Sequence, residues 1–325
     1  MLDGHRIAVV VPAYDEAAQL PNVIASMPAF VDWIIVVDDC SPDNTSDVAR
    51  TAGAKRPGVS VIRHEKNQGV GASIRTGYKK ALELGAAVAA VMAGDGQMEP
   101  GELESLIQPA LAGEADYVKG NRFMDGQAWR VTPKTRYLGN AALSLLTKIA
   151  SGYWHVADSQ SGYTVATARA LRAIDLDRMY GRYGYCNDLL VRLNAAGLVV
   201  QDVAIRSVYG VGERSKMKIW KVIPTISWLL CRLFFWRMKE KYIIRDFHPL
   251  VFFYSMFFVL FPLGLALGGL FIYKFFVRTH ISVPAVVLGT LCMLSAVQFL
   301  LFAMWFDMDY NKHLNKVRQY ANKEP

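Results

Sequence analysis

Short apolar runs alternate with amphipathic segments along residues 1–215. The apolar runs predict β-strands over Ile7–Pro12, Trp33–Asp38, Val59–His64, Ala87–Ala93 and Tyr117–Gly120. The amphipathic segments predict helices over Ala17–Ser26, Thr45–Thr51, Gly71–Leu84 and Glu102–Ala112. This βαβα alternation predicts an α/β domain in which helices cover both faces of a mostly parallel sheet.

Two much longer apolar runs follow, at residues 250–276 and 283–306. Each exceeds the roughly 20 apolar residues that a helix needs to cross a bilayer. Lys274 lies near the end of the first run and Asp307 follows the second, so neither charge falls at mid-membrane. The short link Val277–Ser282 predicts a transmembrane helical hairpin, and two buried helices of a soluble domain fit these lengths poorly.

Basic residues gather on one side of the two runs. Nine Lys or Arg residues lie within 214–245 and four within 312–323, whereas the link holds only Arg278. Positive residues mark cytoplasmic segments, so we expect a multi-pass protein of the inner or plasma membrane whose termini and N-terminal domain are cytoplasmic. The apolar run Ile7–Val11 is too short for the core of a signal peptide.

The formal net charge of +8 is concentrated in the same belt beside the apolar runs. That placement favours anionic lipid headgroups as the partner and argues against nucleic acid. Within the belt, residues 217–242 mix tryptophan and phenylalanine with basic residues, which is typical of a helix in the membrane interface. A helix that covers the soluble domain is the alternative. Pro224 would kink or start this helix.

The predicted organisation therefore has four parts: a catalytic domain at 1–215, a juxtamembrane amphipathic segment at 216–246, the two transmembrane helices at 247–307, and a basic cytoplasmic tail at 308–325. The four cysteines are scattered and show no Cys-x-x-Cys spacing. This suits a reducing compartment and gives no sign of a zinc site or a disulfide framework.

Polar residues follow three of the predicted strands, where α/β sheets bind their ligands. They are Pro12–Glu16, Asp38–Asp39 and Asp95–Gln97. Side chains two apart on an extended segment point the same way, so Asp95 and Gln97 could face one hard cation. A plain Asp-Gly turn is the alternative. A dinucleotide fold is disfavoured because Ile74 stands where the third glycine of G-x-G-x-x-G is required.

The order and spacing of six motifs resemble family 2 glycosyltransferases with the GT-A fold, above all the polyprenyl-phosphate sugar transferases. The motifs are VVPAYDE at 10–16, VVDDCSPDNT at 36–45, NQGVGA at 67–72, DGQ at 95–97, GNRF at 120–123 and DSQSGY at 158–163. The resemblance covers residues 5–215, and the two-span tail is similar to that of one subgroup.

The resemblance implies a set of nucleotide-sugar-binding residues: Pro12, Ala13, Tyr14, Glu16, Asp38, Asp39, Asn67, Gly71 and Asp95. It also implies that Asp95 and Gln97 bind Mg²⁺ or Mn²⁺, with Asp95 as a catalytic residue. Relatives often carry a further aspartate where this chain has Ala93. A metal here would rely more on donor phosphates and water, which suits Mg²⁺, or metal dependence would be weak.

The resemblance also implies an acceptor site for the phosphate of the lipid. Its residues would be Arg122, Arg136 and Asn140. Separately from the resemblance, Ser215 and Lys216 lie in a loop that could close over the phosphate. Arginine forks match phosphate oxygens, although a structural role is open for each arginine. Asp188 aligns with the acidic segment that supplies a catalytic base in many relatives. A phosphate acceptor, whose second pKa is about 6, needs no such base, so Asp188 could instead orient the substrates or cap a helix.

We therefore expect an inverting glycosyltransferase that moves a hexose or N-acetylhexosamine to polyprenyl (undecaprenyl) phosphate. UDP-sugars are favoured as donors over GDP-mannose. A hydroxyl or other lipid acceptor is the alternative, as is an inactive nucleotide-sugar-binding module. A processive polysaccharide synthase is disfavoured, because Q-x-x-R-W is absent. The glycines Gly264, Gly268 and Gly269 would permit a homo-oligomer through close helix packing, or would only loosen the first span.

Overall fold

A computed structural model describes residues 1–124, 134–206, 219–280 and 282–316, without the side chains of 134–138, 140, 219–223 and 316. The chain forms two compact units. The first comprises residues 1–234 together with 313–325, and the second comprises residues 235–312.

The first unit is built on an eight-stranded sheet with the order β3-β2-β1-β4-β6-β5-β7-β8. The strands are β1 (Ile7–Ala13), β2 (Trp33–Asp38), β3 (Val59–Arg63), β4 (Val88–Val91), β5 (Tyr117–Asn121), β6 (Thr164–Thr167), β7 (Val200–Ala204) and β8 (Asn315–Lys316). Only β6 runs antiparallel to its neighbours. The five predicted strands are present, and the mostly parallel sheet is confirmed.

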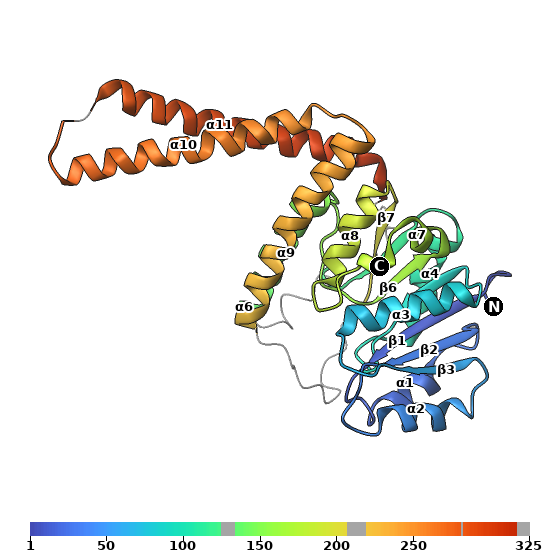
Figure 1. The fold of residues 1–325 in the computed structure, drawn as a ribbon. Helices are drawn as coiled ribbons and strands as arrows, with labels where there is room; N and C mark the ends of the chain where they lie inside the picture. The colour runs from blue at the N-terminus through green and yellow to red at the C-terminus, as the bar shows by residue number, and fades with distance from the viewer. Residues whose placement is uncertain (125–133, 207–218, 281, 317–325) are drawn as a thin grey trace, which may run out of the picture. The chain divides into compact units, whose positions relative to one another are not determined.

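Helices cover both faces of this sheet. They are α1 (Leu20–Ser26), α2 (Thr45–Gly53), α3 (Val70–Glu83), α4 (Leu103–Leu111), α6 (Lys134–Ser151), α7 (Ala168–Ala173) and α8 (Tyr185–Ala195). Alternate residues of β1 pack into different cores, with Ala8 and Val10 facing α3, α7 and α8. Ile7, Val9 and Val11 face α1, α2 and α4. Figure 1 shows α3 on one side of β1 to β3, with α1 and α2 on the other.

One helix begins later than its sequence pattern predicts. The amphipathic pattern starts at Ala17, but α1 begins at Leu20. The backbone N–H of Ala17 instead donates to Asp43 Oδ2 at 3.2 Å, and Asp15 has a positive φ of 60°. Contacts with the loop after β2 thus replace the first helical turn.

The juxtamembrane segment forms the long helix α9 (Ile219–Lys239). One stripe of this helix is buried, at Ile226, Leu229, Leu230 and Leu233, and a side chain added at Gly184 would clash with Leu229. Trp228 is 73% exposed. This part of α9 therefore packs on the first unit, as in the alternative that we considered to a helix in the membrane interface. The side chain of Trp228 points away from the first unit.

The predicted basic tail contributes to the sheet. A 3₁₀ turn at Lys312–Leu314 leads into β8, which pairs in parallel with β7 at Val200 and Gln201. Leu314 is 2% exposed and belongs to the core under α8. Residues 313–316 are therefore part of the fold of the first unit.

The second unit is a hairpin of two long helices, α10 (Leu250–Phe276) and α11 (Val283–Tyr310). Both are long and apolar enough to cross a membrane, and little of either is buried in the protein. They approach closely at two glycines, because a side chain at Gly264 would meet Met293 at 2.8 Å and one at Gly289 would meet Leu267 at 3.1 Å. Gly268 and Gly269 have no such neighbour within 4 Å.

A buried polar cluster closes the base of this hairpin and extends α11 beyond the apolar run. Arg237 and Asp307 are both fully buried and form a two-pronged ion pair of 2.9 and 3.0 Å. Tyr242 and Asn311 donate further hydrogen bonds to Asp307, and Lys241 donates to Asn311 Oδ1 at 2.6 Å. The helix α11 thus continues through Asp307 to Tyr310, and the carboxylate of Asp307 is satisfied by these partners.

Candidate active site

The strand register brings the predicted site residues to one edge of the sheet. β3, β2, β1 and β4 run parallel, and β5 runs the same way because both it and β4 are antiparallel to β6. Their carboxyl ends therefore carry His64, Asp39, Pro12, Met92 and Arg122 along one edge. Tyr163 also lies there, because its carbonyl accepts from Gly120 N at 2.8 Å.

The loops after β1 and β2 are tied to each other. Asp15 N donates to Ser41 Oγ and Glu16 N donates to Thr45 Oγ1, both at 3.0 Å. Ala13, the last residue of β1, accepts the N–H of Asp39 through its carbonyl. The joined loops expose 39% of Tyr14, an aromatic surface of the kind that stacks on a nucleobase.

The two adjacent aspartates at the end of β2 are both held by hydrogen bonds inside the site. Asp39 accepts from Gln68 N, Gly69 N and His64 Nδ1 at 2.7–2.8 Å, and it thereby joins the loop before α3 to the end of β2. Asp38 is fully buried and bonded to Ser41, Ser46 and Arg63. A ligand could reach Asp38 only if it displaced these bonds.

The two residues predicted around the start of α3 differ in exposure. Asn67 is exposed beside the Asp39 contacts. Gly71 is buried, and a Cβ there would lie 2.2 Å from the carbonyl oxygen of Tyr180 and 2.7 Å from Tyr185. Gly71 therefore permits α3 to pack against the segment before α8, a role independent of any ligand.

Asp95 and Gln97 form a compact turn after β4. Asp95 Oδ1 accepts from Gln97 N at 3.0 Å, and Gly96 has a φ of 74°. Both side chains are half-buried. The neighbouring segment is anchored, because Tyr163 Oη donates to Glu99 O at 3.0 Å. The described residues contain no cluster of three or more His, Cys, Asp or Glu side chains around a common point.

Arg122 follows β5 and is held by a buried carboxylate. Its Nε and Nη2 donate to Asp158 at 2.6 and 3.0 Å, and Asp158 is 1% exposed. Burial alone would raise the pKa of Asp158, but the hydrogen bond and charge of Arg122 and the charge of Lys119 hold it below its usual value. Asp158 is thus an anion that fixes the guanidinium.

The remaining predicted acceptor residues are only partly placed. Arg136 and Asn140 lie in the first two turns of α6, which follows the Arg122 segment along the chain. Ser215 and Lys216 lie outside the described residues.

Asp188 is buried in a structural contact. It lies in the first turn of α8, is 1% exposed, and accepts from Tyr180 N and Arg192 Nε, both at 2.8 Å. The carboxylate thereby joins α8 to the segment that packs on Gly71. A role as catalytic base has no support in this geometry.

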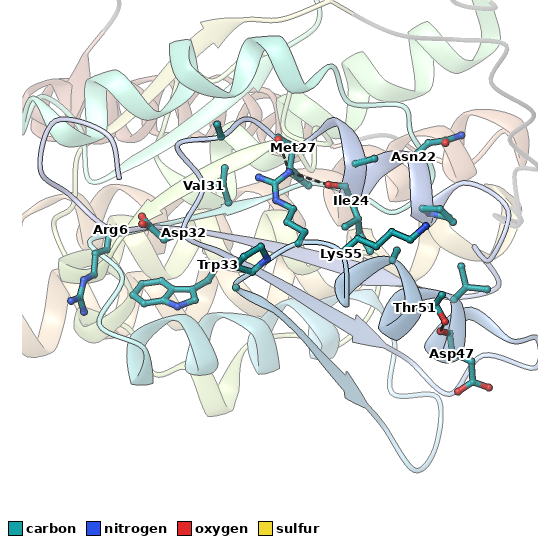
Figure 2. A pocket seen from close by; sticks show the side chains of 18 of the residues that line it. Arg6, Asn22, Ile24, Met27, Val31, Asp32, Trp33, Asp47, Thr51 and Lys55 are labelled. Carbon is teal, nitrogen blue, oxygen red and sulfur yellow. Dashed lines mark hydrogen bonds between the residues drawn. The ribbon is translucent and has the colours of Figure 1, made fainter.

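A surface groove lies elsewhere in the first unit, between α1 and α2 (Figure 2). Trp33, Asp32 and Lys55 line it, and none of the predicted site residues does. Arg56 donates there to the carbonyls of Ile24, Met27 and Pro28, and so caps the end of α1. These contacts show that Arg56 in the groove stabilises the fold, and they indicate no ligand.

Residues 8–174 match the family described as Glycosyl transferase family 2, and the chain belongs to this family of glycosyltransferases. A UDP-N-acetylglucosamine–dolichyl-phosphate N-acetylglucosaminyltransferase of Methanococcus voltae is 33% identical over 216 residues, 62% of this chain and 86% of the relative. An undecaprenyl-phosphate mannosyltransferase of Micrococcus luteus is 33% identical over 215 residues, 65% and 87% of the two chains.

The fold is shared with glucosyl-3-phosphoglycerate synthase of Mycobacterium tuberculosis, crystallised with Mn²⁺, UDP and glucosyl-3-phosphoglycerate. The TM-score is 0.53 at 20% identity, over 72% of this chain and 80% of the synthase. The same synthase has also been crystallised with Mg²⁺ and UDP, with a TM-score of 0.51 and 19% identity to this chain. The expected GT-A architecture is confirmed.

Two residues of the site were not predicted to have a role, although signals existed for both. His64 ends a predicted strand and bridges Asp39 and Thr76, and a polar residue at a strand end is a recognisable signal. Asp158 is the first residue of the DSQSGY motif, but its partner Arg122 lies 36 residues earlier. Only the folded structure reveals this ion pair.

Proposed function

We propose that this glycosyltransferase moves a hexose or an N-acetylhexosamine from a nucleotide sugar to polyprenyl phosphate, with inversion at the anomeric carbon. Family membership supports the reaction type. The named acceptors of its relatives, dolichyl and undecaprenyl phosphate, support the lipid. The two apolar helices of the second unit suit a substrate whose tail stays in a bilayer.

The observation that carries the proposal is the placement of two kinds of group on one sheet edge. Tyr14 and Asp39 lie at the ends of β1 and β2, and Arg122 lies at the end of β5. A donor nucleotide at the first pair and an acceptor phosphate at Arg122 would both approach the β4 end between them, where Asp95 lies. An acceptor oxygen would attack the anomeric carbon there as the bond to the nucleoside diphosphate breaks.

A divalent cation would fit the turn after β4. Asp95 and Gln97 supply hard oxygen donors of the type that Mg²⁺ and Mn²⁺ prefer, and the shortage of further carboxylates leaves ligand positions for donor phosphates and water. When bound, the ion would neutralise the departing diphosphate. The protein side chains alone would bind the ion weakly, so we expect binding to be coupled to the donor.

The buried state of Asp188 favours a phosphate acceptor over a hydroxyl acceptor. A hydroxyl must lose its proton during attack, whereas a phosphate monoester with a second pKa of about 6 is largely a dianion at neutral pH. Because Asp188 is committed to Tyr180 N and Arg192, the site does not offer it as a base.

Donor choice and membrane orientation are the finer parts of the proposal. We favour a UDP-sugar, because one relative is named for UDP-N-acetylglucosamine, whereas mannosyl-transferring relatives keep GDP-mannose as the rival. The excess of Lys and Arg at 214–245 and 312–323 supports a cytoplasmic position for the catalytic domain.

A transfer assay tests this function. Purified full-length protein would be incubated with undecaprenyl phosphate, Mg²⁺ or Mn²⁺, and a panel of UDP- and GDP-sugars, and the lipid would be analysed by mass spectrometry. We expect a lipid that gains one sugar and keeps a single phosphate. Release of nucleoside diphosphate only with hydroxyl acceptors would instead establish the alternative acceptor class.

Two arginine variants test the acceptor site. Arg122→Ala and Arg136→Ala should raise the KM for lipid phosphate far more than the KM for donor. Arg172→Ala, an exposed arginine on α7, is the matched control and should change neither. Equal effects on both substrates would contradict the acceptor assignment.

A further inference from the structure

A second buried aspartate lies beneath the Arg122–Asp158 pair. Asp202, in the middle of β7, is 8% exposed, and it stands opposite Lys119 in the parallel register of β5 and β7. Its Oδ1 has no hydrogen-bond partner in the part of the chain that the structure describes. An unsatisfied oxygen of a buried carboxylate lowers the stability of the fold, so its presence calls for an explanation. The bonds of the other oxygen offer one.

The other oxygen of Asp202 joins two separate segments. Its Oδ2 accepts from Asn121 Nδ2 at 2.7 Å and from Ala157 N at 3.1 Å. The Asn121 side chain also reaches forward, because its Oδ1 accepts from Phe123 N at 2.9 Å. The Asn121 side chain therefore links Asp202 to the backbone of Phe123, the residue that follows Arg122.

The two segments are those that carry the ion pair. Arg122 directly follows Asn121, and Asp158 directly follows Ala157. A single oxygen atom of Asp202 thus binds the side chain of the residue before Arg122 and the backbone N–H of the residue before Asp158. Lys119 is also buried, and its Nζ donates to Ser161 O at 2.7 Å. This bond joins β5 to the segment that follows Asp158.

We propose that Asp202 is a positioning residue of the acceptor-phosphate site, which through Asn121 and Ala157 sets the place and direction of the Arg122 guanidinium. The inference rests on the proposed function only for the identity of the ligand that Arg122 binds. Asp202 itself is buried within β7, so the proposed role is exerted through Asn121 and Ala157. Misplacement of a binding group by about 1 Å can cost as much as ~100-fold in activity. Accurate placement of Arg122 can therefore outweigh the loss of stability caused by burying the carboxylate of Asp202.

Kinetics of two substitutions at one position test the role. Asp202→Ala removes the shared acceptor, and we expect the KM for undecaprenyl phosphate to rise about tenfold or more while the KM for donor changes less than about twofold. Asp202→Asn can keep one oxygen in place of Oδ2, and it should restore most of the lost affinity. An Asn variant as impaired as the Ala variant would contradict the role of that oxygen.

The matched control lies at the other end of the same two strands. Asp116 is 7% exposed and its Oδ2 accepts from Val199 N at 2.9 Å, so it also joins β5 to β7. Asp116→Ala should lower thermal stability to a similar extent and leave both KM values near those of the wild type. If Asp116→Ala produced the same KM change, Asp202 would be a structural residue only.

Hydrogen–deuterium exchange separates this inference from the proposed function. In Asp202→Ala, peptides that contain Phe123 and Ala157 should exchange faster than in the wild type and in Asp116→Ala. Unchanged exchange would overturn the positioning role, whatever the enzyme does. A wild-type protein that makes no lipid product would overturn the proposed acceptor but leave the exchange result as a valid test.

Discussion

Removal of the buried carboxylate at the base of the hairpin should unfold the second unit more readily than any other single charge change in it. Asp307→Ala removes the carboxylate that forms the ion pair with Arg237, and both side chains are 0% exposed. The substitution also deletes the acceptor of the Tyr242 hydroxyl and of Asn311 Nδ2. The cluster would then contain cations but no anion.

The expected cost follows from this burial. Breaking a buried ion pair by removing one partner costs about 3–5 kcal/mol, because the remaining charge is left uncompensated. Lys241 adds to the effect, since burial and then the charge of Arg237 lower its pKa to about 7, and Asp307 opposes that shift. Without Asp307, the amine should be still harder to protonate.

The assay is reversible unfolding of the full-length protein in mixed micelles, followed by circular dichroism. Glu240→Ala is the control, because its ion pair with Arg245 is solvent-exposed and such pairs contribute only about 0–1 kcal/mol. The double variant Arg237→Met with Asp307→Leu should recover most of the loss, since an apolar pair of similar volume can replace a buried ion pair. A single variant within about 1 kcal/mol of the wild type, or a double variant no more stable than the single one, would refute the reasoning.

Three further predictions concern the first unit. Asp95→Ala should abolish sugar transfer while thermal unfolding stays close to that of the wild type, and near-normal turnover would remove Asp95 from the site. Leu314→Ala should cost about 2–4 kcal/mol in thermal or chemical unfolding because the side chain is 2% exposed, and a negligible loss would mean that the β8 segment does not support the fold. Burial raises the pKa of Asp202 to about 6, so its contribution to stability is present at low pH and is lost as the pH rises from about 4 through 6. The stability of Asp202→Asn relative to the wild type should therefore increase over that window in pH-dependent thermal unfolding, and a flat difference would contradict the raised pKa. The comparison must be made between variants, because burial lowers the pKa of His155 to about 4, and its contribution rises with pH over the same range.

The gathering of the candidate site residues at one sheet edge could be predicted because it depends on strand ends. Apolar runs of strand length fixed where Pro12, Asp39, Asp95 and Arg122 fall along the chain. Parallel strands then carry the residues at their carboxyl ends to one edge of the sheet. The antiparallel strand β6 did not disturb this result, since β5 on its far side again runs parallel to β4.

The roles of individual carboxylates could not be predicted in the same way. Asp38 and Asp39 are neighbours in the sequence, yet one is enclosed by Ser41, Ser46 and Arg63 and the other joins the loop before α3. Arg63 lies 25 residues after Asp38, and the partners of Asp39 lie 25 to 30 residues after it, so no local pattern reveals which carboxylate makes which contacts. Asp188 is different, because Arg192 stands four residues later on the same helix, and that spacing already favours an ion pair over a catalytic base.

The ion pair between Arg122 and Asp158 explains why an acceptor site of this kind would need a second arginine. Asp158 remains ionised, since Arg122 and Lys119 keep its pKa low, so the charge of Arg122 is already balanced before any phosphate arrives. A balanced guanidinium can fix the direction of a phosphate, but it supplies little net attraction for a dianion. Arg136, in the first turn of the helix that follows, would be an additional cation for the proposed acceptor site. On this reasoning Arg122 mainly orients the acceptor and Arg136 mainly attracts it, so added salt should weaken lipid-phosphate binding less in Arg136→Ala than in Arg122→Ala.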